Sequence, residues 1–88
     1  MSWNIHPGEI LREEFMKPLD LSSRKLAHFL EVPAPRINDI ILERRGITAD
    51  TALRLARYFK TTPNFWMNLQ VSYELRAAEQ NLQKKSVH

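Results

Sequence analysis

The sequence predicts an all-α protein in which one domain of five helices spans residues 1–88. Apolar residues recur every three or four positions in five separate segments, which is the period of an amphipathic helix. Capping residues and prolines stand between these segments. The chain contains only 2 glycines among 88 residues, which favours helices over a sheet. A chain of this length holds one modest core, so we expect no second domain.

The composition narrows the classes of function. There are 13 lysines and arginines against 10 acidic residues, and the net charge of +3 permits a polyanionic partner without requiring one. The absence of cysteine excludes disulfides and cysteine-ligated zinc. No apolar run reaches membrane-spanning length, and no signal-peptide pattern is present. We therefore expect a cytoplasmic protein that contacts no membrane and needs no cofactor.

The first helix is predicted to run from Glu9 to Lys17. Pro7 suits a position in the first turn of a helix, and Pro18 ends the pattern. The residues expected to face the core are Ile10, Leu11 and Phe15.

A short second helix is predicted to begin at Ser23. Ser22 suits its N-cap, because a serine hydroxyl can accept a hydrogen bond from a free amide of the first turn. Glu31 interrupts the helical pattern, and Pro33 follows it. The apolar side of this helix consists of Leu26, Ala27 and Leu30.

A third helix follows the bend, and residues 22–42 together read as a helix-turn-helix unit. Ile37, Ile40 and Ile41 form an inward stripe and leave a polar outer face. The Leu42-Glu43 sequence offers no glycine to stop the helix. We therefore expect it to continue a turn further, towards residue 46.

Two more helices are predicted after Gly46. Thr48 can cap the fourth helix, and Asp50 in its first turn suits the helix dipole. Thr62 and Pro63 repeat the pattern of cap and first-turn proline, and open a fifth helix over about residues 63–83. The inward stripe of the fourth helix is Ala52, Leu55, Ala56 and Phe59.

The long C-terminal helix carries two apolar stripes. The first consists of Trp66, Leu69, Tyr73 and Ala77, and the second of Met67, Val71, Leu75, Ala78 and Leu82. We assign one stripe to the domain's own core and the other to a partner helix, and we place the second stripe at the interface of a homodimer. The alternative is that both stripes pack on the first helix and on the N-terminal stretch around Trp3 and Ile5.

Five short helices with the second and third joined by a tight turn form a lambda-repressor-like arrangement, in which the third helix enters the major groove of DNA. The strings HPGEILREEF, LSSRKLAHFLEVP, RRGITADTALRLARYF and TPNFWMNLQ resemble HigA-type antitoxins of the xenobiotic-response-element (XRE) family of transcriptional regulators. The resemblance implies a homodimeric autorepressor that binds an inverted repeat in the operator of its own toxin-antitoxin operon. It also implies that the protein neutralises a HigB-type toxin, an mRNA-cleaving ribonuclease of RelE-like fold.

The resemblance further implies which residues read bases, at the start and on the outer face of the third helix. These positions are Ala34, Pro35, Arg36, Asn38 and Asp39. Arg36 can pair with guanine, Asn38 with adenine and Asp39 with cytosine. Asp39 has the alternative role of holding Arg36 in place. The residues expected to bind phosphates are Ser22, Ser23, Lys25, Arg44 and Arg45.

Three departures from the family pattern lie in or directly after the helix-turn-helix unit. Glu31 stands where the family usually has a glycine, so we expect a strained or slightly wider turn. Pro33 stands where a serine or threonine usually caps the third helix, and Pro35 is a second residue without an amide, so fewer backbone donors are available there. The third departure is Leu42-Glu43, which stands where the family commonly has an Asn-Gly stop.

An enzyme is not indicated. The three histidines, His6, His28 and His88, have no metal-ligand spacing, and we expect them to be surface residues. Glu13 and Glu14 are adjacent and project in different directions from a helix, which argues against an acid-base pair. Two alternatives to the antitoxin function remain: a stand-alone phage-type regulator, and a protein-interaction module that binds DNA weakly.

Overall fold

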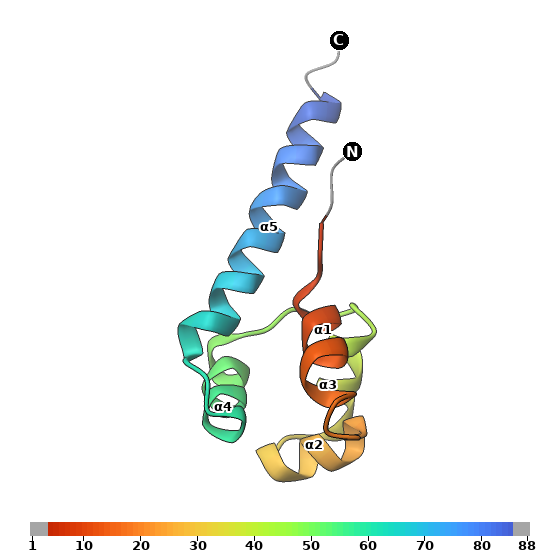
Figure 1. Ribbon diagram of the computed structural model, residues 1–88. Coiled ribbons are helices and arrows are strands. Elements are labelled where there is room, and N and C mark those ends of the chain that lie inside the picture. The colour runs from red at the N-terminus through yellow and green to blue at the C-terminus, as the bar shows by residue number, and fades with distance from the viewer. Residues whose placement is uncertain (1–3, 86–88) are drawn as a thin grey trace.

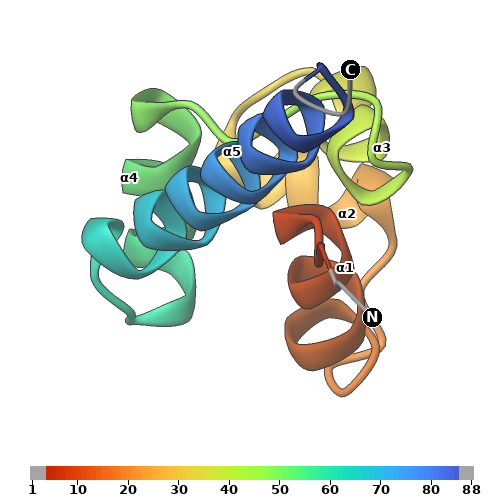
Figure 2. The same cartoon turned by 90° about the horizontal axis from the view of Figure 1, so that it is seen from above.

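The computed structural model describes residues 4–85, and all regular elements in this range are helices. They are α1 (Pro7–Ile10), η1 (Leu11–Met16), α2 (Ser23–Leu30), α3 (Ala34–Ile41), α4 (Ala49–Phe59) and α5 (Pro63–Lys85). Figure 1 shows α5 rising out of the group formed by the other helices, with α2 near the opposite end of the molecule. Seen from above in Figure 2, α4 and α1 lie on opposite sides of α5. Because α1 and η1 are continuous, the structure confirms the predicted all-α fold of five helices.

The first helix differs from the prediction in its bounds and in its pitch. It begins at Pro7, ends at Met16 and becomes π-helical from Leu11. The amide of Lys17 donates to the carbonyl oxygen of Arg12, five residues back, at 3.0 Å. This wider turn lets Leu11 and Met16, which are five residues apart, both reach the core. A prediction that assumes the regular period of an α-helix therefore does not place Met16 in the core.

His6 is buried, so the prediction of a surface histidine was wrong at this position. Its Nδ1 atom accepts a hydrogen bond from the amide of Gly8 at 2.8 Å and thereby caps α1. Its ring and the ring of Tyr73 pack in a T-shaped arrangement, with the ring centroids 4.7 Å apart. Burial lowers the pKa of His6, although the nearby Glu43 carboxylate opposes the shift. The lowered pKa favours the neutral ring, which alone can accept a hydrogen bond at Nδ1.

The caps of the later helices follow the prediction. Ser22 Oγ accepts from the amide of Lys25 at 3.1 Å, and α2 begins at Ser23 as expected. Thr48 Oγ1 accepts from the amide of Thr51 at 3.4 Å at the start of α4. At the start of α5, the hydroxyl oxygen of the threonine before the helix accepts a hydrogen bond from a backbone amide at 3.1 Å in the same way. These bonds are local in sequence, so the sequence alone could predict them.

The turn between α2 and α3 is strained at Glu31, as expected. Glu31 caps α2 in the left-handed region, at φ 60° and ψ 44°. A residue with a Cβ atom costs about 1–2 kcal/mol in that region, whereas glycine does not. Pro33 then provides the N-cap of α3 without a side-chain hydrogen bond.

The third helix stops earlier than we expected. It ends at Ile41 and does not continue towards Gly46, because Leu42 leaves the helical region at φ −90° and ψ 5°. Glu43 then adopts φ 62°, the left-handed conformation that glycine usually supplies after a helix. A glutamate therefore terminates α3.

Trp66 is the largest fully buried side chain of the core. Its indole N–H donates to Thr61 Oγ1 at 2.8 Å, so its one polar atom is satisfied. The rings of Phe15, Phe59 and Phe65 surround it, with centroids 4.8, 6.3 and 5.0 Å away. This cluster joins η1, α4 and α5, and it fixes the base of the long helix.

The two stripes of α5 have different environments. Members of the first stripe are buried or half-buried: Trp66, Leu69, Tyr73 and Ala77. In the second stripe Val71, Leu75 and Leu82 are 47%, 61% and 66% exposed, and Ala78 is exposed as well. Met67 is the exception, because it is half-buried and packs against the core. The alternative in which both stripes pack on the protein's own domain is therefore wrong.

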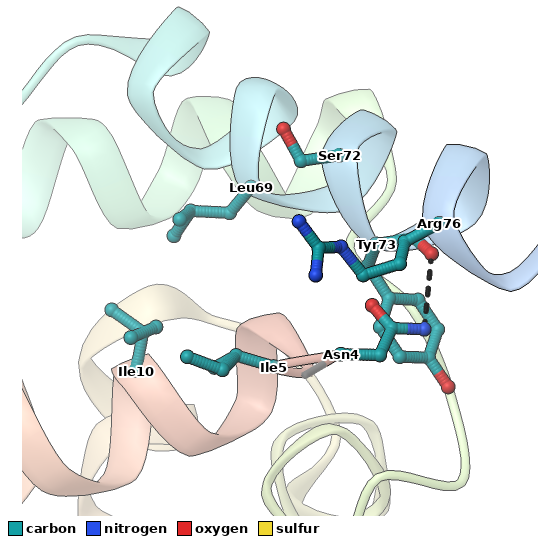
Figure 3. A pocket seen from close by; sticks show the side chains of 7 residues that line it. All are labelled: Asn4, Ile5, Ile10, Leu69, Ser72, Tyr73 and Arg76. Atoms are coloured by element: carbon teal, nitrogen blue, oxygen red, sulfur yellow. Dashed lines mark hydrogen bonds between the residues drawn. The ribbon is translucent and has the colours of Figure 1, made fainter. Parts of the chain in front are cut away.

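A shallow groove separates the N-terminal segment from α5. Figure 3 shows the side chains that line it, which are Asn4, Ile5, Ile10, Leu69, Ser72, Tyr73 and Arg76. Asn4 Nδ2 donates to the carbonyl oxygen of Tyr73 at 3.3 Å and holds the segment beside the helix. His28 is exposed, as expected, whereas Trp3 and His88 lie outside the described residues.

Replacing Glu31 with glycine is expected to stabilise the protein. The substitution removes left-handed strain but gives the unfolded chain more freedom, so we expect a net gain of about 0.5–1 kcal/mol. Chemical denaturation would measure it. As a control, Arg57→Gly places glycine inside α4 and should lower the free energy of unfolding by about 1 kcal/mol. A loss of stability in Glu31→Gly would contradict the strain argument.

Candidate nucleic-acid interface

A groove between the start of α2 and the outer face of α3 unites most of the predicted base-reading residues. Its lining residues are Ser23, Arg24, Ala34, Pro35, Asn38 and Asp39. Asn38 and Pro35 are exposed, and Ala34 and Asp39 are half-buried. Four of the five predicted base readers therefore share one surface with a predicted phosphate-binding serine.

Arg36, the fifth predicted base reader, lies on the other flank of α3. It lines a neighbouring hollow, together with Arg45, Thr48, Asp50 and Thr51. Its side chain is 31% exposed. The outer face of α3 thus presents an arginine on the flank beside α4 and an asparagine on the flank beside α2.

Asp50 holds Arg36, so the alternative that gave this task to Asp39 was wrong. Asp50 Oδ2 accepts from Arg36 Nη1 at 2.6 Å and from Arg54 Nε at 3.0 Å. These hydrogen bonds, first the one from Arg36 and then the one from Arg54, lower the pKa of Asp50. The carboxylate therefore stays ionised and keeps both partners well below neutral pH.

Asp39 instead faces the basic pair after α3. Its two carboxylate oxygens lie 3.9 Å from Arg44 Nη1 and 4.0 Å from Arg45 Nη2. Pairs of this length at an exposed site contribute little free energy. Both arginines can therefore turn towards a phosphate without a large loss.

The start of α2 places its polar residues unevenly. Ser22 is exposed but its hydroxyl already caps the helix, and Lys25 is exposed without lining the groove. Arg24 does line the groove, although it was not among the predicted phosphate-binding residues. Its position next to Ser23, at the start of the helix that helix-turn-helix proteins usually lay across the DNA backbone, was the signal that could have identified it.

The C-terminal end of α3 is fixed by the first helix. A Cβ atom on Gly8 would clash with the carbonyl oxygen of Ile40, so the two backbones approach as closely as a glycine allows. Arg12 Nη1 donates to the carbonyl oxygen of Ile41 at 2.6 Å. This bond satisfies one of the carbonyls that the end of a helix leaves free. Both contacts limit how far α3 can tilt.

Other kinds of site are not indicated in the part of the chain that the structure describes. Residues 4–85 contain no group of histidine and acidic side chains placed to bind a metal ion. Within the same residues, none of the helices has both the length and the apolar character that crossing a membrane requires.

Sequence comparison places the chain among known regulators. The family model described as helix-turn-helix matches residues 13–66, from the first helix to the start of α5. Virulence-associated protein I of Dichelobacter nodosus is 55% identical over 83 residues, which cover 94% of this chain and 77% of that protein. The similarity therefore extends beyond the helix-turn-helix unit to both ends of the domain.

Solved structures share the whole architecture. The antitoxin HigA of Pseudomonas aeruginosa, solved with the higBA promoter, is 52% identical, with a TM-score of 0.92 over 98% of this chain and 94% of that one. An addiction module antidote protein of a HigA family from Coxiella burnetii is 48% identical, with a TM-score of 0.89 over 96% and 91% of the two chains. The chain therefore belongs to the helix-turn-helix family of DNA-binding regulators, in the group of HigA-type antitoxins.

Proposed function

We propose that the protein is the antitoxin of a type II toxin-antitoxin pair and the repressor of its own operon. In this role it works in the cytoplasm as a homodimer, binds an inverted repeat in its operator and neutralises a HigB-type toxin. The observation that carries the proposal is the exposed outer face of α3, which presents base-reading side chains beside the start of α2. The Pseudomonas antitoxin that was solved with a promoter has the same architecture.

The chemistry of the outer face supports direct readout of bases. Asn38 is exposed in the groove and carries the donor and acceptor that adenine requires. Arg36 can present guanidinium nitrogens to a guanine from the opposite flank of α3. Asp39 can accept from cytosine, and Ala34 and Pro35 offer apolar contacts near the start of the helix.

Basic residues on both sides of α3 suit the DNA backbone. Arg44 and Arg45 follow the helix, and Arg24 and Lys25 lie near the start of α2. Such contacts position a protein on DNA and make its affinity depend on salt, whereas base contacts specify the sequence.

The exposed stripe of α5 supports a homodimer. Val71, Leu75, Ala78 and Leu82 recur at helical spacing and stay uncovered by the protein's own domain. A symmetric dimer buries the same patch of both copies. To read an inverted repeat, the two copies must present their α3 helices about 34 Å apart, one turn of DNA, and we expect this spacing in the dimer.

A gel shift on the promoter fragment tests the repressor and antitoxin roles together. The protein would be co-expressed with the product of the neighbouring small reading frame, and binding would be measured with and without that product. We expect a shift with the protein alone, copurification of the two proteins and loss of the partner's toxicity. No shift in either state would overturn the repressor role, and failure to copurify would overturn the antitoxin role.

Replacing Arg44 and Arg45 together with alanine is expected to weaken binding to all DNA sequences. The slope of log affinity against log salt concentration should become shallower by about 0.9 for each phosphate that the variant no longer neutralises. Fluorescence anisotropy at several salt concentrations measures this slope. The charge-matched control is Arg57→Ala with Lys60→Ala, at the far end of α4 from Asp50. An unchanged slope in the first variant would remove both arginines from the interface.

Replacing Leu75 with glutamate is expected to separate the dimer without unfolding the domain. Leu75 is 61% exposed within the chain, so the substitution disturbs little packing in the monomer. A symmetric interface would bury the new carboxylate twice, which should raise the dimer dissociation constant at least about tenfold. Analytical ultracentrifugation measures this constant, and circular dichroism checks the helices. Gln83→Glu, which is exposed and lies about 120° around α5 from the centre of the stripe, should stay dimeric. A dimeric Leu75→Glu variant would exclude the stripe from the interface.

A further inference from the structure

We propose that Asp50 and Arg54 are positioning residues that set operator specificity through Arg36, without themselves reading bases. The inference rests on the proposed DNA-binding function. It assigns a role in recognition to two side chains of α4, which lies outside the helix-turn-helix unit of α2 and α3. Asp50 suits such an indirect role because its negative charge is repelled by phosphates.

A chain of polar contacts joins the three helices. Arg36 Nη1 on α3 donates to Asp50 Oδ2 at 2.6 Å, and Arg54 Nε donates to the same oxygen at 3.0 Å. Arg54 Nη1 also donates to the carbonyl oxygen of Leu30, the last residue of α2, at 2.8 Å. The network therefore connects a base-reading arginine to the turn of the helix-turn-helix unit.

The hydrogen bond with Asp50 leaves Arg36 able to bind a guanine. A guanidinium group carries five N–H donors, and the bond to Asp50 is made through Nη1. The Nε and Nη2 atoms can still form the paired hydrogen bonds that guanine accepts at O6 and N7. The carboxylate thus selects one orientation of a long side chain that would otherwise sample several rotamers.

Asp50 needs support because its own side chain is 55% exposed. Arg54 supplies this support from the next turn of α4, and its anchor on the Leu30 carbonyl oxygen fixes its own position. The positive end of the α4 dipole also favours an acidic residue in the first turn, where Asp50 lies. Asp50 thus orients Arg36, and Arg54 in turn orients Asp50.

Removing the carboxylate has two effects that act in the same direction. Arg36 loses its preferred orientation, so more side-chain entropy is lost when it binds the operator. Its positive charge is also no longer neutralised, so it is attracted more strongly to any phosphate. The first effect weakens specific binding, and the second strengthens non-specific binding. The ratio of the two affinities falls.

Asp50→Asn is the direct test, because it removes the charge and keeps the shape of the side chain. We expect the ratio of operator affinity to non-specific affinity to fall about threefold to tenfold, with the loss confined to the base pair read by Arg36. Arg54→Lys keeps the positive charge but loses the planar guanidinium group, which binds Asp50 and the Leu30 carbonyl oxygen at once. This variant should therefore also lower the ratio of the two affinities. Fluorescence anisotropy on operators with single base-pair changes measures both variants.

Glu43→Gln is the matched control, because Glu43 is exposed beside α3 and the charge change is the same. It should raise the affinity for all DNA without lowering discrimination at the base pair read by Arg36. A second control repeats Asp50→Asn in an Arg36→Ala background, where it should have no further effect on specificity. A loss of specificity that persists in that background would overturn the inference.

Arginine side-chain NMR of the free protein provides a test that needs no DNA. Arg36 should give an ordered Nε signal in the wild type and a more mobile one in Asp50→Asn. Equal mobility in the two proteins would overturn the inference. A wild type without operator preference would overturn the proposed function itself, whereas a preference that Asp50→Asn fully retains would overturn only the inference drawn from Asp50.

Discussion

The burial of Ile37 and Ile40 is the interaction on which the geometry of the proposed DNA face depends. The helix α3 has only eight residues, and a helix of that length is not stable on its own in water. Both isoleucines are fully buried, so packing forms the helix and orients it at the same time. The contacts of Gly8 and Arg12 with its last carbonyls then limit its tilt. The core beneath α3 therefore sets the orientation of its outer face.

The long helix α5 packs on the core at its start and exposes an apolar stripe farther along its length. Its first turns carry Trp66 and the buried Gln70, whose Oε1 atom accepts from the amide of Ile47 at 2.8 Å. That bond ties α5 to the segment between α3 and α4, close to the basic pair. Farther along the helix, the apolar side chains of the second stripe are exposed. One rigid rod thus connects the surface proposed to face DNA to the surface proposed to join two copies.

Local chemistry explains which features the sequence alone could predict. The caps at Ser22 and Thr48 depend on residues within three positions of each other, and the inward stripes depend on a regular period. The pairing of Arg36 with Asp50 joins residues 14 positions apart in different helices, and the burial of His6 requires Tyr73 from α5. Such features depend on tertiary packing, which no local pattern contains. The family resemblance predicted the base-reading surface but not the network behind it.

The chain places its glycines and its left-handed turns at different positions. Neither of its two glycines has a positive φ, and both lie where a Cβ atom would collide with a neighbour. The left-handed positions are occupied by charged residues, which are Asp20, Glu31, Glu43 and Lys60. All four side chains are exposed to solvent. The left-handed backbone conformation at these positions does not depend on their charge. A substitution that changes the charge at such a position can therefore alter the electrostatic potential around the protein while the fold stays the same.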